Sequence, residues 1–192
     1  MRFLSVPAAA FLLGWTAVAA IDGGRLSAQS GQGHLLRNPS ILKPVADPSA
    51  EVREFIAGKF PAEPDVVIQV PKILVLQRPV TWDEQEMALA AWEKLRAVLG
   101  SLRLFREVRV RPPGRLLFRT AATDAAPPAG MSRTWLEVEG QLVDTQTGKV
   151  LGEVRVLADA LGQAGTVSRR AAEQVPERVA EALARFVRRV VR

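Results

Sequence analysis

The sequence contains no cysteine and no tyrosine, and its only histidine is His34. Without cysteine the chain can form no disulfide, no thiolate metal site, no cysteine nucleophile and no lipid-modified N-terminal cysteine. With one histidine, the usual general bases and metal ligands are nearly absent as well. We therefore predict that the protein is not an enzyme, uses no cofactor, and has no catalytic, cofactor-binding or metal-binding residues.

The few remaining candidates for chemistry have simpler structural interpretations. His34 follows a Gly-Gln-Gly segment, which is typical of a solvated loop. Glu137 and Glu139 are a pair of carboxylates, but their i, i+2 spacing is typical of the wet face of a strand. The segment Gly162-Gln163-Ala164-Gly165 lacks the rest of a phosphate-binding motif.

Basic residues outnumber acidic ones by 26 to 20, giving a formal net charge of +6. Most of the basic residues are arginines, and they alternate with Val, Leu and Glu as on the solvated sides of strands and helices. A nucleic-acid surface would instead gather them with aromatic residues or glycines. We predict no nucleic-acid partner, while peripheral contact with an anionic membrane or polysaccharide remains open.

The N-terminus has the three-part pattern of a secretory signal. Arg2 provides a positive start, no charged residue occurs from Phe3 to Ile21, and Ala17-Val18-Ala19 offers the small residues that signal peptidase reads. We predict a signal peptide over residues 1–19 and a periplasmic or secreted mature protein. The alternative is an uncleaved signal that anchors the protein in the inner membrane, since about 20 apolar residues can span a bilayer.

After the signal, residues 20–60 are predicted to be a flexible lead-in, and residues 61–192 a single α/β domain. The lead-in is rich in Gly, Ser, Gln, Asn and Pro up to about residue 48. A short helix is predicted within Ser49–Lys59, because Glu51, Val52, Phe55 and Ile56 recur at helical spacing.

Two longer helices are predicted in the domain. A capping box starts the first: the Thr81 hydroxyl can accept from the Glu84 amide while the Glu84 carboxylate accepts from the Thr81 amide. Its buried stripe consists of Ala88, Ala91, Trp92, Leu95, Val98 and Leu99. Gly100 is expected to end it. The second helix runs from about Ser168 to Arg192, with Pro176 either in its first turn or at a kink.

Strands are predicted from β-branched runs and from strict alternation of apolar and polar residues. The expected segments are 66–70 and 73–76, which form one strand bent at Pro71 or two strands, followed by 105–110, 116–123, 136–142 and 150–158. One sheet face would carry Glu137, Glu139, Gln141, Glu153 and Arg155. We expect this polar face to be solvated, and the alternative is that it meets a partner.

A structural turn is predicted from Asp144, Thr147 and Gly148. Asp144 can accept hydrogen bonds from backbone amides two residues on, and Gly148 can adopt positive φ before the returning strand. Together the elements predict an α+β fold. We expect a two-layer sandwich with a mostly antiparallel sheet of four to five strands and two helices on one face.

The stretch from Leu116 to Ala158 resembles the bacterial domain of unknown function family 3313, whose members are predicted envelope lipoproteins. The segments LLFRTAATDA and WLEVEGQLVDTQTGKVLGEV carry the resemblance, with matching residues Glu137, Glu139, Asp144, Thr145, Thr147, Gly148 and Lys149. It implies an envelope location and an α/β fold, and no catalytic residues. The lipobox cysteine of that family is absent here, so lipid anchoring is not implied.

These observations predict a non-catalytic, exported periplasmic or envelope protein that acts as a binding or assembly module. An envelope protein would be its partner, docking on the sheet face or on the arginine-rich last helix. The alternative is a carrier of a small hydrophobic or anionic ligand in the periplasm, which requires an apolar pocket near Trp92 with converging arginines. The oligomeric state stays open.

Overall fold

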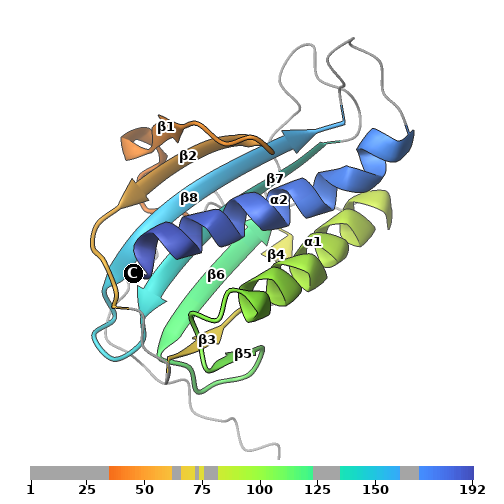
Figure 1. Ribbon diagram of the computed structural model, residues 1–192. Coiled ribbons are helices and arrows are strands. Elements are labelled where there is room, and N and C mark those ends of the chain that lie inside the picture. Colours follow the sequence, from red (N-terminus) through yellow and green to blue (C-terminus); the bar gives the residue numbers. More distant parts are fainter. Residues whose placement is uncertain (1–34, 62–65, 72–73, 76–81, 123–134, 161–168) are drawn as a thin grey trace, which may run out of the picture.

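The computed structural model describes residues 35–61, 66–71, 74–75, 82–122, 135–160 and 169–192. They form an α+β structure of two layers, with helices α1 (Trp82–Ser101) and α2 (Arg169–Val190) on one face of a mixed sheet (Figure 1). The predicted signal peptide and His34 lie outside the described residues. Within the described ranges, no helix is both long enough and apolar enough to cross a membrane.

The sheet has eight strands in the order β1-β2-β8-β7-β6-β3-β5, and β4 also pairs with β6. A 3-10 turn, Pro39–Ile41, precedes them. The strands are β1 (Lys43–Val45), β2 (Glu51–Ile56), β3 (Val67–Gln69), β4 (Leu74–Val75), β5 (Glu107–Arg109), β6 (Leu116–Ala122), β7 (Trp135–Asp144) and β8 (Val150–Asp159). The predicted class and the helices on one face are confirmed, but four to five strands is too few.

One half of the sheet is antiparallel and the other is parallel. Strands β1, β2, β8, β7 and β6 pair antiparallel, whereas β3 and β4 run parallel to β6, and β5 runs parallel to β3. The parallel half arises because α1 is a crossover between β4 and β5, which returns the chain in its original direction. The runs on either side of Pro71 are thus two strands.

The short helix predicted within Ser49–Lys59 is wrong, because this segment contains strand β2. Its residues pair with β8 from Glu51 opposite Leu157 to Ile56 opposite Gly152. Val52 and Glu54 both point toward the helices and are buried. Sequence periodicity missed this strand because one inward residue is a glutamate rather than an apolar residue.

Both long helices are present, with small differences from prediction. The predicted stripe of α1 packs against the core, with Trp92 and Val98 partly buried. The helix continues through Gly100 to Ser101, so the glycine does not end it. In α2, Pro176 is the eighth residue of the helix, which rules out the first turn. Residue Thr81 and the side chain of Glu84 lie outside the described part, so the capping box stays a prediction.

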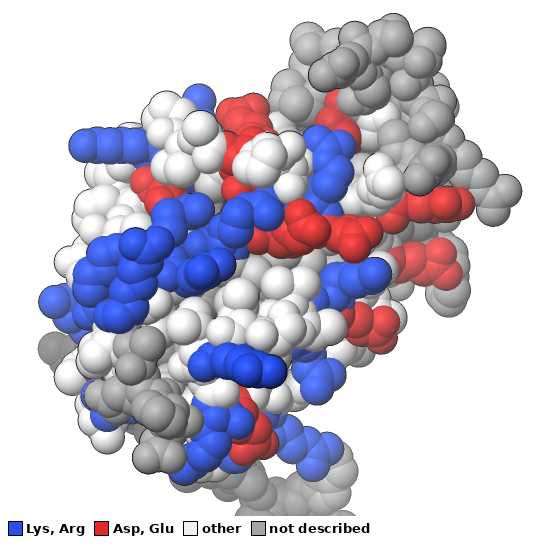
Figure 2. All heavy atoms as spheres, viewed as in Figure 1, with Lys and Arg blue, Asp and Glu red and all other residues white. Residues whose placement is uncertain are grey.

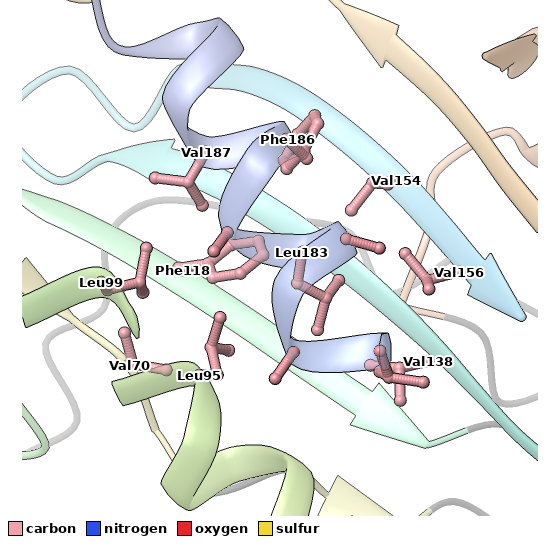
Figure 3. Close-up of a cluster of buried hydrophobic side chains, with 14 of the residues drawn as sticks. Val70, Leu95, Leu99, Phe118, Val138, Val154, Val156, Leu183, Phe186 and Val187 are labelled. Atoms are coloured by element: carbon pink, nitrogen blue, oxygen red, sulfur yellow. The ribbon is translucent and has the colours of Figure 1, made fainter. Parts of the chain in front are cut away.

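The core lies between the sheet and the two helices (Figure 3). Phe118 of β6 meets Phe186 of α2 with ring centroids 6.0 Å apart. Gly140 of β7 makes room for the Phe118 ring, because a Cβ there would lie 2.9 Å from both Phe118 and Val154. Buried apolar side chains therefore fill the space between the sheet and the helices. Burying each large one contributes about 1.5–3 kcal/mol to the stability of the fold.

Candidate functional site: the two outer surfaces

The five polar residues expected on one sheet face do lie together there. Gln141 stands opposite Glu153 and Glu139 opposite Arg155 in the β7–β8 pairing, with Glu137 two residues along. Their neighbours Val138 and Val154 point into the core, so these five residues point away from the helices. We call this set, Glu137, Glu139, Gln141, Glu153 and Arg155, the outer sheet face.

The prediction that the outer sheet face is solvated is wrong. The exposed fractions are 3% for Glu137, 1% for Glu139, 4% for Gln141 and 2% for Glu153. The chain at residues 35–37 contributes to this burial. Glu139 Oε2 accepts from the amides of Leu35 and Leu36 at 2.8 and 3.4 Å, and Glu153 Oε1 accepts from the Arg37 amide at 3.1 Å. Backbone donors more than 100 residues away in sequence thus replace water.

The carboxylates of this face have side-chain donors as well. Arg155 donates from Nε and Nη2 to the two oxygens of Glu137 at 2.7 and 2.8 Å. This bond to Glu137 raises the pKa of Arg155, although burial opposes the shift. Gln141 Nε2 donates to Glu153 Oε1 at 2.8 Å. Carboxylates held in this way act as fixed hydrogen-bond acceptors, which is a structural role.

The β7–β8 turn has the geometry expected of an Asp-x-x-Thr-Gly sequence. Asp144 Oδ1 accepts from the Gln146 amide at 3.0 Å, and Oδ2 accepts from Thr147 Oγ1 at 3.0 Å. Gly148 has φ of 67°. Partial burial works against ionisation of Asp144, but its bonds to Gln146, Thr147 and Arg115 outweigh it and lower its pKa.

Three arginines of α2 hold the segment before β2 and the strand itself. Arg185 donates to both oxygens of Asp47 at 2.8 Å, and Arg178 Nε donates to the Ser49 carbonyl at 2.5 Å. Arg189 donates to both oxygens of Glu54 in β2. Sequence reasoning missed these bonds, because nothing near Asp47 or Glu54 in the chain signals a partner more than 130 residues away.

The outward sides of α1 and α2, which we call the outer helix surface, separate charges by sign. The helices run in the same direction (Figure 1), and Lys94 of α1 lies 3.9 Å from Glu177 of α2. Figure 2 shows basic side chains gathered over the C-terminal half of α2 and acidic ones along its N-terminal half. Exposed members are Arg188 and Arg192 at the basic end and Glu173 and Glu177 at the acidic end. This arrangement suits the aligned helix dipoles.

A groove lies between the helices at the basic end. Its volume is about 260 Å³, and Val98, Leu102 and Ala184 supply apolar lining while Glu181, Arg185 and Arg188 supply charge. Trp92, which a carrier would need beside an empty pocket, donates from Nε1 to the Val70 carbonyl at 3.3 Å. Among the described residues, no group of three acidic or histidine side chains could hold a metal ion.

No family model matches the chain, and a search of curated proteins finds no match either. One solved structure shares its fold, and a second gives a weaker match. The PelC dodecamer from Paraburkholderia phytofirmans is 15% identical with a TM-score of 0.50, over 74% of this chain and 99% of that chain. A Xanthomonas campestris protein of the domain of unknown function family 330 is 11% identical with a TM-score of 0.46, over 69% of this chain and 91% of that chain. At such identities the likeness shows the fold alone.

Proposed function

We propose that this chain is a non-catalytic, exported envelope protein that serves as an assembly module and binds further copies of itself. The observation that carries the proposal is the separation of charge on the outer helix surface (Figure 2). A surface that is basic at one end and acidic at the other can dock head to tail on an identical copy. Such heterologous contacts close into rings or extend into filaments.

The same surface offers apolar complementarity. Leu89, on the N-terminal half of α1, is 42% exposed, and the exposed acids Glu86 and Glu93 flank it. In a head-to-tail contact, Leu89 of one copy enters the groove of the next copy beside Val98 and Ala184. Glu173 and Glu177 of the first copy then meet Arg188 and Arg192 of the next. Charge then selects the orientation and the apolar contact adds affinity.

PelC, which has a similar fold and forms a dodecamer, gives a precedent for assembly of this architecture. The signal pattern of residues 1–21 and the resemblance to family 3313 support export to the envelope. The non-catalytic role is supported by the outer sheet face, where each carboxylate accepts hydrogen bonds from fixed donors. The carrier alternative has less support, since Phe118, Phe186 and their neighbours fill the interior beside Trp92.

Native mass spectrometry and light scattering on the exported chain test the proposal. We expect an oligomer for the wild type, and a monomer for R188E/R192E and for E173R/E177R. Combining the four substitutions should restore the oligomer, because both ends of the contact then carry reversed signs. The control R53E/R111E changes the charge equally at exposed positions outside the outer helix surface.

A monomeric wild type at tens of micromolar, or a quadruple variant that stays monomeric while folded, would contradict self-assembly. Circular dichroism must show each variant folded, since an acidic residue in the last turn of α2 costs about 0.5 kcal/mol through the helix dipole. Export is tested separately by cell fractionation with an intact-mass measurement, and retention of residues 1–19 would support the anchored alternative.

A further inference from the structure

The chain between α1 and β6 is unusually basic. From Leu102 to Arg115 it holds five arginines and a single acidic residue, Glu107. The fold brings three of these arginines, Arg106, Arg109 and Arg115, to the wall of one hollow of about 370 Å³. The hollow lies where β5, the start of β6 and the β7–β8 turn meet, and its other lining residues are Val67, Pro113, Gly114, Thr145 and Gln146.

The walls of the hollow are fixed by the backbone. Thr145 donates from its amide to the Arg115 carbonyl at 3.0 Å and from its hydroxyl to the Gly114 carbonyl at 2.7 Å. Gly114 lies so close to β3 that a Cβ would meet the Gln69 backbone nitrogen at 3.2 Å. The arginines therefore extend from a frame that is set before any ligand arrives, which reduces the entropy lost on binding.

Arg109 is directed to this hollow by the strand register. Val108 packs on the core, so Arg109 and Glu107 project from the opposite side of β5. Arg109 Nη1 donates to the Pro113 carbonyl at 3.2 Å, and its Nη2 pairs with Glu107. Its Nε is buried and has no hydrogen-bond acceptor among the described residues. The guanidinium group of Arg109 is thus oriented by its neighbours at the wall of the hollow, with its side chain partly exposed.

The balance of charge around the hollow favours an anion. Among the described residues its lining includes three arginines and no acid, while Glu107 and Asp144 nearby pair with Arg109 and Arg115. A second hollow, of about 240 Å³ beside the outer sheet face, makes a useful contrast. Its charged lining is Glu51, Arg53, Glu137 and Arg155, which sum to zero. The charged side chains that line the first hollow are all guanidinium groups, whereas those that line the second hollow and the groove between the helices include carboxylates.

We propose that the hollow beside β5 binds a phosphate ester, with Arg106 and Arg109 as the principal ligands of its oxygens. Guanidinium groups match the geometry of phosphate oxygens through paired N–H donors. The volume exceeds that of bare phosphate and leaves room for a small organic group. A soluble ester and the headgroup of an anionic phospholipid share this chemistry. The proposal does not depend on self-assembly, because it uses a different surface.

A competing explanation is that these arginines only protect the edge of the sheet. Strand β5 is an edge strand, and charged side chains on an edge discourage pairing with other chains. Under that explanation the hollow binds nothing and the arginines are interchangeable with other exposed ones.

Titration of the full exported chain with sn-glycerol 3-phosphate, followed by two-dimensional NMR, separates the two explanations. We expect saturable shifts at Arg109, Gly114 and Thr145. R109Q should weaken binding at least about tenfold, the size expected for loss of a charge-assisted hydrogen bond. R109K should give an intermediate loss of affinity, since lysine keeps the positive charge but lacks the paired N–H donors of the guanidinium group. The matched control R53Q, at an exposed position outside the hollow and outside the outer helix surface, should bind like the wild type.

R106Q provides a second variant at an exposed position, in case R109Q lowers stability. Flotation with phosphatidylglycerol and phosphatidylcholine vesicles then identifies the source. Binding to phosphatidylglycerol alone, competed by glycerol 3-phosphate, indicates a lipid headgroup, whereas soluble binding without flotation indicates a soluble ester. The proposal is overturned by an absence of shifts up to 10 mM ligand together with no flotation. It is equally overturned if R53Q weakens binding as much as R109Q.

Discussion

The outer sheet face and the outer helix surface are both rich in charged residues, but they use this charge differently. On the sheet, Glu137, Glu139 and Glu153 are buried, and their oxygens accept from Arg155, from Gln141 and from the backbone of residues 35–37. On the helices, residues such as Arg188 and Glu177 are exposed. The comparison teaches that the polar side of an alternating strand need not face water. Its carboxylates can be buried when backbone amides from a distant part of the chain donate hydrogen bonds to them.

The two surfaces should therefore respond to substitution on different scales. Removing a donor from a buried carboxylate leaves a desolvated charge, whereas an exposed side chain returns to water at little cost. Three substitutions test this difference between buried and exposed charged groups, beginning with the largest expected effect.

Arg155→Met should lower the free energy of unfolding by about 3 kcal/mol, because it leaves the buried Glu137 carboxylate without its paired bonds. Arg188→Met makes the same chemical change on the outer helix surface and should cost less than about 0.5 kcal/mol. Urea unfolding of both variants measures the difference. Equal losses would show that the two surfaces do not differ as described.

Asp47→Asn should lower the free energy of unfolding by about 1–2 kcal/mol at pH 7, since it weakens the paired bonds from Arg185. Burial opposes ionisation of Asp47, but its bonds to Arg185 and Ser49 prevail and lower its pKa. A lowered pKa means that this stability is present above the unfolded value near 4 and is lost as the pH falls through the folded value.

The gap between wild type and Asp47→Asn should accordingly close as the pH falls from about 4 toward 2, as followed by thermal unfolding at each pH. Glu93→Gln, at an exposed position of α1, is the control and should change stability by less than about 0.5 kcal/mol. A gap that persists undiminished at pH 2 would mean that the Asp47 charge is not what binds Arg185.

Lys94→Ala should have the smallest effect, less than about 0.5 kcal/mol in urea unfolding. Its ion pair with Glu177 spans 3.9 Å, and both side chains are more than half exposed. A loss above about 1 kcal/mol exceeds the usual contribution of an exposed ion pair. It would show that charged residues on the outer helix surface contribute as much to stability as those on the outer sheet face. The substitution Lys94→Gln controls for the loss of the aliphatic stem, and its effect should be milder still.

Much of the fold could be predicted because its signals are local. Strict alternation identifies β7, helical spacing identifies α1, and Asp144 with Gly148 identifies the turn between β7 and β8. Strand β2 could not be identified in this way, because Glu54 occupies an inward position that only Arg189 of the distant helix α2 makes acceptable. The sequence does predict strands β3, β4 and β5, within segments 66–70, 73–76 and 105–110, but not their parallel pairing, because that depends on which strands meet after the chain crosses over through α1.

The sequence predicts which residues share each candidate surface, but not whether they are buried or which groups they bind. Alternation places Glu139 and Glu153 on one face of the sheet, yet their burial depends on amides at residues 35–37 that carry no sequence signal. Similarly, the sequence shows that the last helix is rich in arginine, but not which of these arginines bind carboxylates of the same chain. Arg185 and Arg189 bind Asp47 and Glu54, while Arg188 between them stays exposed.

The pairing of β2 with β8 has a consequence for the order in which the chain folds. Val52 meets Val156, so β2 and its partner strand are roughly a hundred residues apart in the chain, and bringing them together costs loop-closure entropy. The β7–β8 hairpin closes over a five-residue turn and can form within microseconds, which creates the edge that β2 then joins. We therefore expect β1 and β2 to join the sheet after the β7–β8 hairpin has formed.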